Sequence, residues 1–164
     1  PPPGGGPNLD TCALRVAFLA YTNLYPEGLV AGEGRPGVSD ARLENVLERI
    51  AEARGRADVV VVSYHWGDEY QTTSNSSQQK IARSLIDAGT DLVIGHHSHV
   101  VQEVEKYKDG WIAYSLGNFV FDQDFSEETM RGLMLRAFVR GRKISRVEQV
   151  PIRISKTFQP YVVE

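Results

Sequence analysis

The chain has 164 residues, 41% of them hydrophobic, which is enough for one compact domain with a buried core. Its 18 basic and 21 acidic residues give a formal net charge of −3, and neither sign gathers into a run. The sequence therefore offers no basic surface for nucleic acid or an anionic membrane. Cys12 is the single cysteine, which excludes a disulfide bond within the chain.

The first residues are rich in proline and glycine. The run PPPGGGP at residues 1–7 favours neither helix nor strand, so we interpret residues 1–13 as a linker or a cut end. A linker implies a preceding segment. We therefore expect residues 14–164 to be the later part of a longer polypeptide.

The next elements predict a strand followed by a helix. An apolar run at residues 14–21 is typical of a strand, and residues 22–38 form a long connection that is a candidate lid over a site. Apolar side chains then recur at helical spacing over residues 43–51, and Ser39 or Asp40 is the expected cap.

A strand–helix–strand unit follows. Apolar runs at residues 59–62 and 91–94 predict two buried strands. The helical pattern between them has Ser76 and Gln79 as a capping box and Gly89 as its stop. Because such a crossover makes the strands parallel, their carboxyl ends lie at the same sheet edge. The first half of the chain thus predicts a β-α-β-α-β arrangement.

The second half changes to strand patterns, with turn signals at residues 108–110 and at Gly141. The predicted antiparallel strands are residues 100–107, 111–115, 132–140 and 143–154. The fold class is therefore α/β, a mixed sandwich without internal repeats.

Histidine is concentrated at the ends of the two predicted parallel strands. His65 follows the first, and the run GHHSH at residues 95–99 follows the second. We therefore expect His65, His97 and His99 to converge at one sheet edge, where imidazole suits Zn, Fe, Mn or Ni. A lone histidine such as His65 is also compatible with a structural role. We expect His96 to support a ligand by a hydrogen bond or to pack in the interior.

Three segments carry a family resemblance: SYHWGDEY at residues 63–70, IGHHSHVVQ at residues 94–102 and YSLGNFVFD at residues 114–122. Together and in this order they resemble the capsule-synthesis CapA family, which is associated with poly-γ-glutamate capsules and is similar to the calcineurin-like metallophosphoesterases. The resemblance spans roughly residues 14–155. It implies a dinuclear metal site at the edge of a four-layer α/β/β/α sandwich, of which residues 14–164 are the carboxyl-terminal part.

By position, the resemblance implies that His65, His97 and His99 are metal ligands. This chain has Ser98 where the family usually has proline, a change that should loosen the turn without removing a ligand. Glu69 is a candidate to orient His65 or a bound water, and an ordinary exposed carboxylate is the alternative.

The predicted catalytic set is His99, Asn118 and Glu69. Asn118 lies at a predicted strand end, where its amide can meet a substrate oxygen, and a turn-forming role is the alternative. His99 is a candidate general acid as well as a ligand, and a histidine from a missing segment is another candidate.

The family's amino-terminal half has no counterpart here. That half carries an Asp ligand near a Gly-Asp pair, an Asn-Leu-Glu segment and an Asn-Asn-His segment. The implied cofactor is a divalent transition metal (Mn, Fe or Zn), with two ions in the intact protein. Because three histidines cannot hold two ions, we expect the chain alone to be catalytically incompetent. The missing half would be needed in cis or as a separate chain.

The resemblance implies a function in poly-γ-glutamate capsule biosynthesis, through a hydrolase-type site that uses metal-activated water on a phosphoester or γ-glutamyl bond. The alternative is a non-catalytic accessory or binding module of the capsule machinery. A structural α/β domain with surface histidines is the third reading. The expected partners are capsule-synthesis proteins and an anionic polymer. The expected location is the bacterial cell surface or envelope, although no targeting segment is recognisable in these residues.

Overall fold

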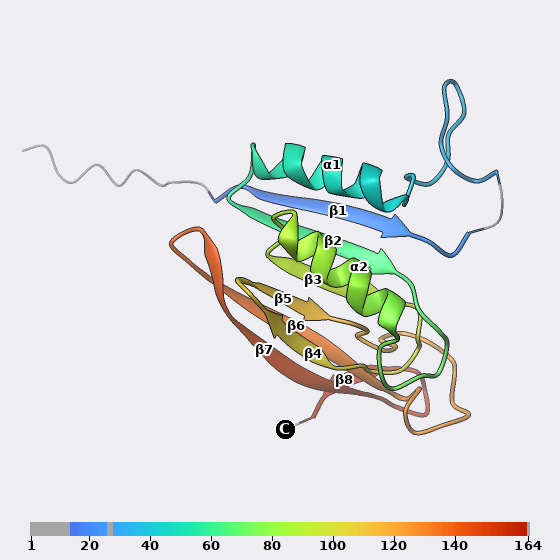
Figure 1. The fold of residues 1–164 in the computed structure, drawn as a ribbon. Helices are drawn as coiled ribbons and strands as arrows, with labels where there is room; N and C mark the ends of the chain where they lie inside the picture. Colours follow the sequence, from blue (N-terminus) through green and yellow to red (C-terminus); the bar gives the residue numbers. More distant parts are fainter. Residues whose placement is uncertain (1–13, 26–27, 164) are drawn as a thin grey trace, which may run out of the picture.

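The computed structural model describes residues 14–25 and 28–163, so the predicted linker at residues 1–13 lies outside the described residues (Figure 1). In chain order the elements are β1 (Val16–Thr22), α1 (Leu43–Arg54), β2 (Val59–His65), α2 (Ser76–Asp87), β3 (Leu92–His96), β4 (Val104–Tyr107), β5 (Gly110–Ala113), β6 (Arg131–Arg140), β7 (Lys143–Ile154) and β8 (Pro160–Val162). The described strands form a five-stranded sheet in the order β1-β2-β3-β5-β4 and a three-stranded sheet in the order β6-β7-β8.

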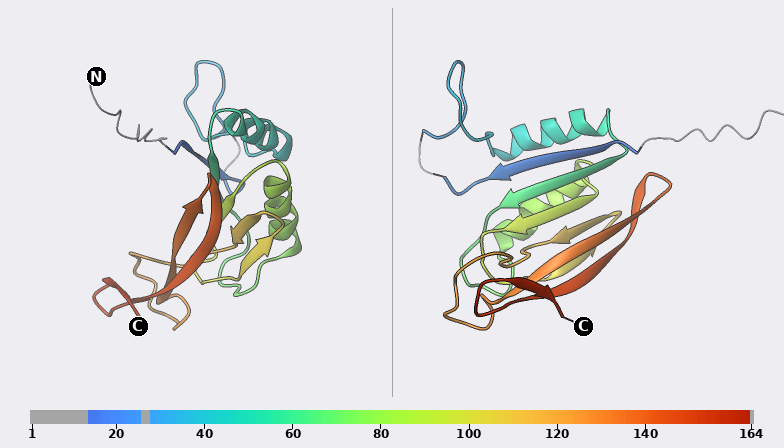
Figure 2. Two further views of the ribbon diagram at one scale, coloured as in Figure 1. Left: turned by 90° about the vertical axis from the view of Figure 1, so that its left-hand side faces the viewer. Right: turned by 180° about the vertical axis from the view of Figure 1, so that it is seen from behind.

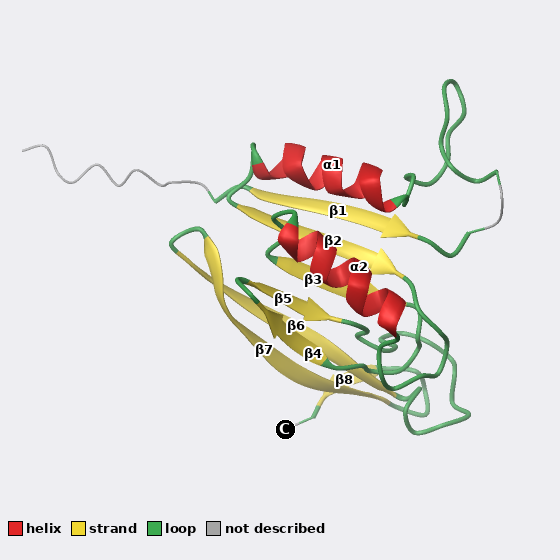
Figure 3. Cartoon of the chain, viewed as in Figure 1, coloured by secondary structure: helices red, strands yellow, loops and turns green. Residues whose placement is uncertain are grey.

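Strand β2 is an interior strand of the larger sheet, next to the edge strand β1. It contains four consecutive valines, whose branched side chains favour extended backbone, and all four are buried. The strand pairs in parallel with β1 and β3, in a register that sets His65 opposite Thr22 on one side and His96 on the other. The predicted convergence of the strand ends at one edge is therefore confirmed (Figure 3).

Both helices pack on one face of this sheet, and the smaller sheet packs on the other (Figure 2). Along β2 the valines alternate between these two cores because successive side chains of a strand point to opposite faces. Val60 and Val62 join the helical core, whereas Val59 and Val61 belong to a second core that contains Ile144 of β7. The described residues thus form three layers, α/β/β, with the parallel sheet in the middle.

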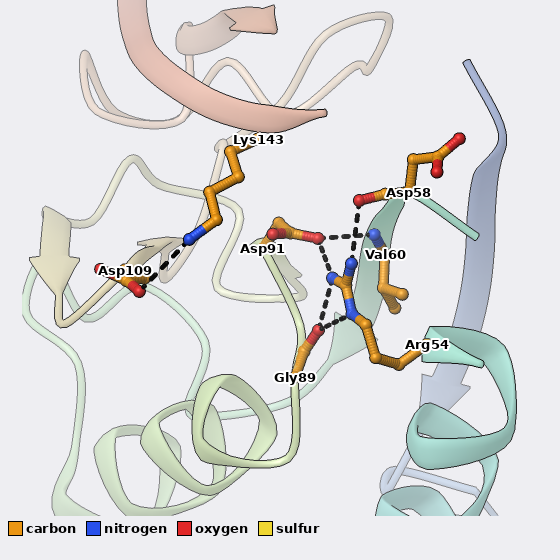
Figure 4. A network of polar contacts seen from close by, with 7 residues as sticks. All are labelled: Arg54, Asp58, Val60, Gly89, Asp91, Asp109 and Lys143. Carbon is orange, nitrogen blue, oxygen red and sulfur yellow. Dashed lines mark hydrogen bonds and ion pairs between the residues drawn. The ribbon is translucent and has the colours of Figure 1, made fainter. Parts of the chain in front are cut away.

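The end of the sheet opposite the histidines is tied together by Arg54, in the last turn of α1 (Figure 4). Its guanidinium donates to the carbonyl oxygens of Gly89 (3.0 and 2.7 Å) and Asp58 (2.8 Å) and pairs with the carboxylate of Asp91. Asp91 also accepts a hydrogen bond from the backbone N–H of Val60 at 2.8 Å. This network links α1 to the starts of β2 and β3 and so helps to set their register.

The helix caps differ from the prediction. The capping box of α2 is Asn75 with Gln78, one residue earlier than the expected Ser76 and Gln79. Each side chain accepts a hydrogen bond from the other residue's backbone N–H at 2.9 Å. Gln78 is buried and donates to Gln102 at 3.0 Å, so a tertiary contact fixes the position of the box.

Helix α1 also begins differently from the prediction of a cap at Ser39 or Asp40. The cap residue is Arg42, and no side chain caps the helix. The carboxylate of Asp40 instead accepts hydrogen bonds from the backbone N–H and the guanidinium of Arg42, at 2.9 and 2.8 Å. Arg42 therefore engages the carboxylate of Asp40, which the sequence pattern predicted to cap the start of the helix.

The described residues 28–38 of the predicted lid do not form a cover over the histidines (Figure 1). Residues 28–38 close on themselves through backbone hydrogen bonds, from Ala31 to Val38 at 3.0 Å and from Val38 to Leu29 at 2.9 Å. This hairpin-like segment projects past α1, away from the strand ends that carry the histidines (Figures 1 and 2). Because it satisfies its own backbone groups, it needs no contact with the site.

The carboxyl-terminal half contains the predicted antiparallel hairpin β6–β7, with an irregularity between Phe138 and Val139. The prediction that residues 111–115 form only antiparallel pairs was wrong. Strand β5 is antiparallel to β4 but parallel to β3, because residues 97–103 cross over before β4 begins. None of the described helices combines the length and the apolar character that crossing a bilayer requires.

Candidate metal centre

The carboxyl ends of β2 and β3 bring three histidine rings into one cluster. His65 is the last residue of β2, and His97 and His99 lie in the loop that follows β3. The ring centroids of His65 and His97 are 4.7 Å apart, and those of His97 and His99 are 6.1 Å apart. The structure therefore places the three predicted ligands side by side.

The loop that carries the histidines has an uncommon backbone conformation. The φ angles of His97 and His99 are 105° and 58°, in a region that side-chain-bearing residues rarely occupy, at a cost of about 1–3 kcal/mol each. Ser98, between them, is fully buried, and its carbonyl oxygen accepts a hydrogen bond from the backbone N–H of Tyr70 at 2.8 Å. Strain of this kind persists only where surrounding contacts hold it, and it clusters at functional sites.

Gly95 makes the close approach of the neighbouring strands possible. A Cβ atom at this position would lie 1.9 Å from the backbone oxygen of Tyr114 and 2.6 Å from Nε1 of Trp66. Those two atoms form a buried hydrogen bond of 3.0 Å that passes beside β3. The glycine before the histidines is therefore required by the packing of Trp66, the residue after β2, against Tyr114, the residue after β5.

Glu69 joins two of the histidines in a group that fits a metal ion. The potential ligand atoms of Glu69, His97 and His99 all lie within 4.8 Å of one another. Glu69 is exposed and both histidines are half-buried, so the group is open to solvent on one side. One carboxylate and two imidazoles are donors that Zn, Mn and Fe accept. The chemistry of the donor set therefore fits the metal implied by the sequence.

Glu69 was expected to orient His65 or a bound water, and its place among the possible ligands was not expected from the sequence. The connection after β2 turns sharply, with φ of 87° at Gly67 and 62° at Tyr70, and this path returns Glu69 to the histidines. Glycine in the motif HWGDE was the available signal for that turn.

His65 lies beside this group and not in it. Desolvation lowers the pKa of His65, and the nearby charge of His97 lowers it further. Both effects favour the neutral imidazole, which is the form that binds metals. Asp122 and Asp124 are exposed and lie outside the group.

Asn118 holds His99 in one orientation. Its Oδ1 is 2.9 Å from Nδ1 of His99, and its Nδ2 donates to the carbonyl oxygen of Thr129 at 3.0 Å. Because that carbonyl only accepts, the amide orientation is fixed with Oδ1 facing the imidazole. Nδ1 therefore carries the proton, and the lone pair is on Nε2.

The same contacts change the roles expected from the sequence. The amide nitrogen of Asn118 donates to Thr129 and to Gln123 (3.2 Å), and its side chain is buried, so both of its polar atoms contact groups of the protein. Asn118 thus acts through His99. With Nδ1 engaged, His99 has one free ring nitrogen, which can bind a metal or donate a proton but cannot do both.

Aromatic rings surround His99. Tyr70 stacks at a centroid distance of 5.9 Å, and Phe121 lies at 5.1 Å. Gln123 connects Tyr70 to Asn118. Its Nε2 donates to the hydroxyl of Tyr70 at 3.2 Å, and its Oε1 accepts from Nδ2 of Asn118. The imidazole is thus held by packing and by hydrogen bonding together.

His96 points elsewhere although it is adjacent to His97. Its Nε2 lies 3.0 Å from Oγ of Ser63 on β2. Desolvation by burial lowers the pKa of His96, which favours a neutral ring. His96 is therefore a hydrogen-bonded interior residue and stands outside the group of possible ligands.

Comparison with known proteins identifies the class of this protein. The chain matches the family described as bacterial capsule synthesis protein PGA_cap over residues 8–123, and it belongs to that family. The match contains all three motifs and ends before β6. The resemblance recognised in the sequence is therefore confirmed.

Two Bacillus relatives carry names from capsule or PGA biosynthesis, and a mycobacterial relative is named for polyglutamine synthesis. The chain is 37% identical over 147 residues to the capsule biosynthesis protein CapA of Bacillus anthracis, covering 87% of this chain. It is 40% identical over 139 residues to the PGA biosynthesis protein CapA of Bacillus subtilis, covering 85%. It is 30% identical over 155 residues to a probable polyglutamine synthesis accessory protein of Mycobacterium tuberculosis. The chain spans only 36% of the length of each Bacillus relative and 40% of the mycobacterial one.

Proposed function

We propose that this chain is one part of a CapA-like protein of poly-γ-glutamate capsule biosynthesis and that it carries part of a metal-dependent hydrolase-type site. The observation that carries the proposal is the group of Glu69, His97 and His99, whose ligand atoms lie within 4.8 Å of one another. The names of the Bacillus relatives support the process, and the exposed sheet edge is where α/β proteins place their chemistry.

Glu69, His97 and His99 would hold one divalent ion of Mn, Fe or Zn. His65, whose ring centroid is 4.7 Å from that of His97, would contribute to a second ion in the intact protein. A bound ion supplies Lewis acidity and a water nucleophile at neutral pH. Asn118 keeps the lone pair of His99 on Nε2, so the proton for a leaving group must come from another residue.

The edge strand β1 supports the proposal that a further part of the protein packs here. Val16 and Phe18 are 53% and 63% exposed. They lie on the face of the sheet opposite the helices, and the core formed with the smaller sheet includes no residue of β1. Strand β1 has β2 as its one neighbour in the described sheet, so its other edge is open to pairing. We propose that the three observed layers belong to a four-layer α/β/β/α sandwich, of which this chain is the carboxyl-terminal half. The missing half would pack against β1, in cis or as a separate chain.

A non-catalytic accessory role is the second candidate. The residues that the structure describes contain one group of three possible ligands, which is fewer than two ions need. The mycobacterial relative is named as a probable accessory protein. In either role, the capsule names of the relatives favour a place in the bacterial cell envelope, in contact with other capsule-synthesis proteins and an anionic polymer.

Metal analysis and turnover test the proposal together. We expect this chain, dialysed after loading with Mn, Fe or Zn, to retain well under two ions, and Glu69→Gln to lower the retained amount. Hydrolysis of a generic phosphodiester should stay near background until the amino-terminal part of a relative is supplied. Strong metal-dependent turnover by the chain alone would contradict the incomplete site. A full complement of metal without turnover in the completed protein would favour the accessory role.

A further inference from the structure

A cavity of about 460 Å³ lies beside the loop of the candidate metal centre. Its lining includes Val100 and Val101, which directly follow His99, together with Arg131 and Arg153 of the smaller sheet. The volume is within the range of about 300–1,000 Å³ that is typical of ligand sites. The cavity is therefore large enough for a short stretch of a polymer.

The chain segments that build the metal centre also build this cavity. Tyr70 stacks on His99, and Thr72, two residues later, lines the cavity. The carbonyl oxygen of Thr129 holds Asn118, and Arg131 follows in the same segment. The cavity and the candidate metal centre are therefore built by the same segments of the chain.

Two arginines face the same side of the sheet at this cavity. Arg131 on β6 and Arg153 on β7 are direct partners across the antiparallel pair, so their side chains project together. Like charges in directly opposite positions are destabilising unless something compensates them. The arrangement therefore favours an anionic partner.

The protein provides little compensation. Arg131 pairs with Glu127 at 2.7 Å, but Glu127 is 76% exposed, and ion pairs of this kind contribute about 0–1 kcal/mol. Among the described residues, Arg153 has no carboxylate within ion-pair distance. Glu128 is the one acidic residue in the lining, so the lining residues by themselves carry one more positive than negative charge.

We propose that this cavity is a binding subsite for a carboxylate-rich chain, with Arg131 and Arg153 as the anion-binding residues. The proposal rests on the proposed function, because it assigns the polymer that the metal centre would act on or hold. Guanidinium groups match carboxylates with two parallel hydrogen bonds. The apolar lining at Val101, and at Leu133 and Pro151 on the same face of the sheet as the arginines, suits the methylene groups between successive carboxylates of a γ-linked glutamate chain.

The test uses a fluorescently labelled γ-linked glutamate oligomer and the metal-free chain. We expect the double variant Arg131→Gln/Arg153→Gln to bind the oligomer about tenfold more weakly or worse. The matched control is Arg136→Gln/Arg140→Gln, which removes the same charge from β6 outside the cavity lining and should change affinity about twofold at most. Thermal unfolding of each variant verifies that it is folded.

A third variant tests the direction of the effect. Glu127→Gln removes the carboxylate that pairs with Arg131, so it should tighten oligomer binding. Equal losses in the two double variants, or no loss in either, would overturn the subsite. Inorganic phosphate that competes as well as unlabelled oligomer would assign the arginines to phosphate and overturn the carboxylate ligand.

Metal titration separates this proposal from the proposed function. The variant Arg131→Gln/Arg153→Gln should bind metal as the unmodified chain does. Metal binding by a chain that does not bind the oligomer would overturn the subsite alone. Arginine-dependent oligomer binding without any metal binding would support the subsite and contradict the metal centre.

Discussion

The most direct test of the site's geometry is the replacement of Asn118 by leucine. This change removes the hydrogen bond of 2.9 Å to Nδ1 of His99 while keeping a side chain of similar size. The lone pair of His99 is then no longer confined to Nε2. Loss of a partner that orients a metal-ligating histidine weakens metal affinity about 10- to 100-fold, which is about 1.4–2.7 kcal/mol.

The same replacement affects folding stability, and the two effects must be measured separately. Asn118→Leu leaves the buried carbonyl oxygen of Thr129 without its donor, which costs about 1–3 kcal/mol of unfolding free energy. Urea unfolding of the metal-free protein measures this cost. Competition with a chromophoric chelator for Zn²⁺ then measures metal affinity in the folded variant.

Asn118→Asp is the matched control. Aspartate keeps an acceptor for Nδ1 of His99 but loses the donor to Thr129, so it should retain metal affinity while losing stability. Equal metal affinity in Asn118→Leu and the unmodified chain, with both folded, would refute the orienting role. An equally large loss of affinity in both variants would refute it as well, because the effect would then come from packing.

Three further predictions follow from single residues. His97→Ala should reduce metal affinity far more than His96→Ala, since His96 contacts Ser63; a larger loss for His96→Ala in metal titrations would mean that the ligand pair is His96 with His99. Gly95→Ala should destabilise the fold by about 2–5 kcal/mol in urea unfolding, because its Cβ would lie 1.9 Å from a backbone oxygen; a change near zero would show that β3 can shift freely. The carboxylate of Asp58 accepts a hydrogen bond from the backbone N–H of Arg15, and this bond lowers the pKa of Asp58 below its ordinary value of 3.8. The ionised Asp58 therefore stabilises the fold above pH 3.8, and this stabilisation is lost as the pH falls through the lowered pKa. Asp58→Asn should therefore flatten the stability profile in that window, and an unchanged profile would remove Asp58 as its cause.

The regular part of the fold was predictable because its signals are local. Four consecutive valines in β2 and the apolar spacing of α2 specify a buried strand and a helix, whatever their neighbours. The crossover rule then places the carboxyl ends of β2 and β3 at one edge. The histidine cluster followed from that rule, since His65 and the loop after β3 lie where the strands end.

The errors arose where a distant contact decided the local structure. Gln78 forms the capping box of α2 because it also bonds to Gln102, 24 residues away. Strand β5 pairs in parallel with β3 because the chain crosses over before β4, a choice that no local pattern records. Segments of similar strand propensity can pair in several ways, and only the whole sheet selects one.

The sequence by itself determined the family, the alternation of strands and helices, and the edge at which the histidines meet. Periodicity and motif spacing carry that information because each element is specified by neighbouring residues. Only the tertiary structure decided that Glu69 lies with His97 and His99, and that Asn118 fixes the proton of His99. The physical reason is that side-chain contacts depend on the path of the loops, and that path is set by left-handed residues and long-range hydrogen bonds that leave no local pattern in the sequence.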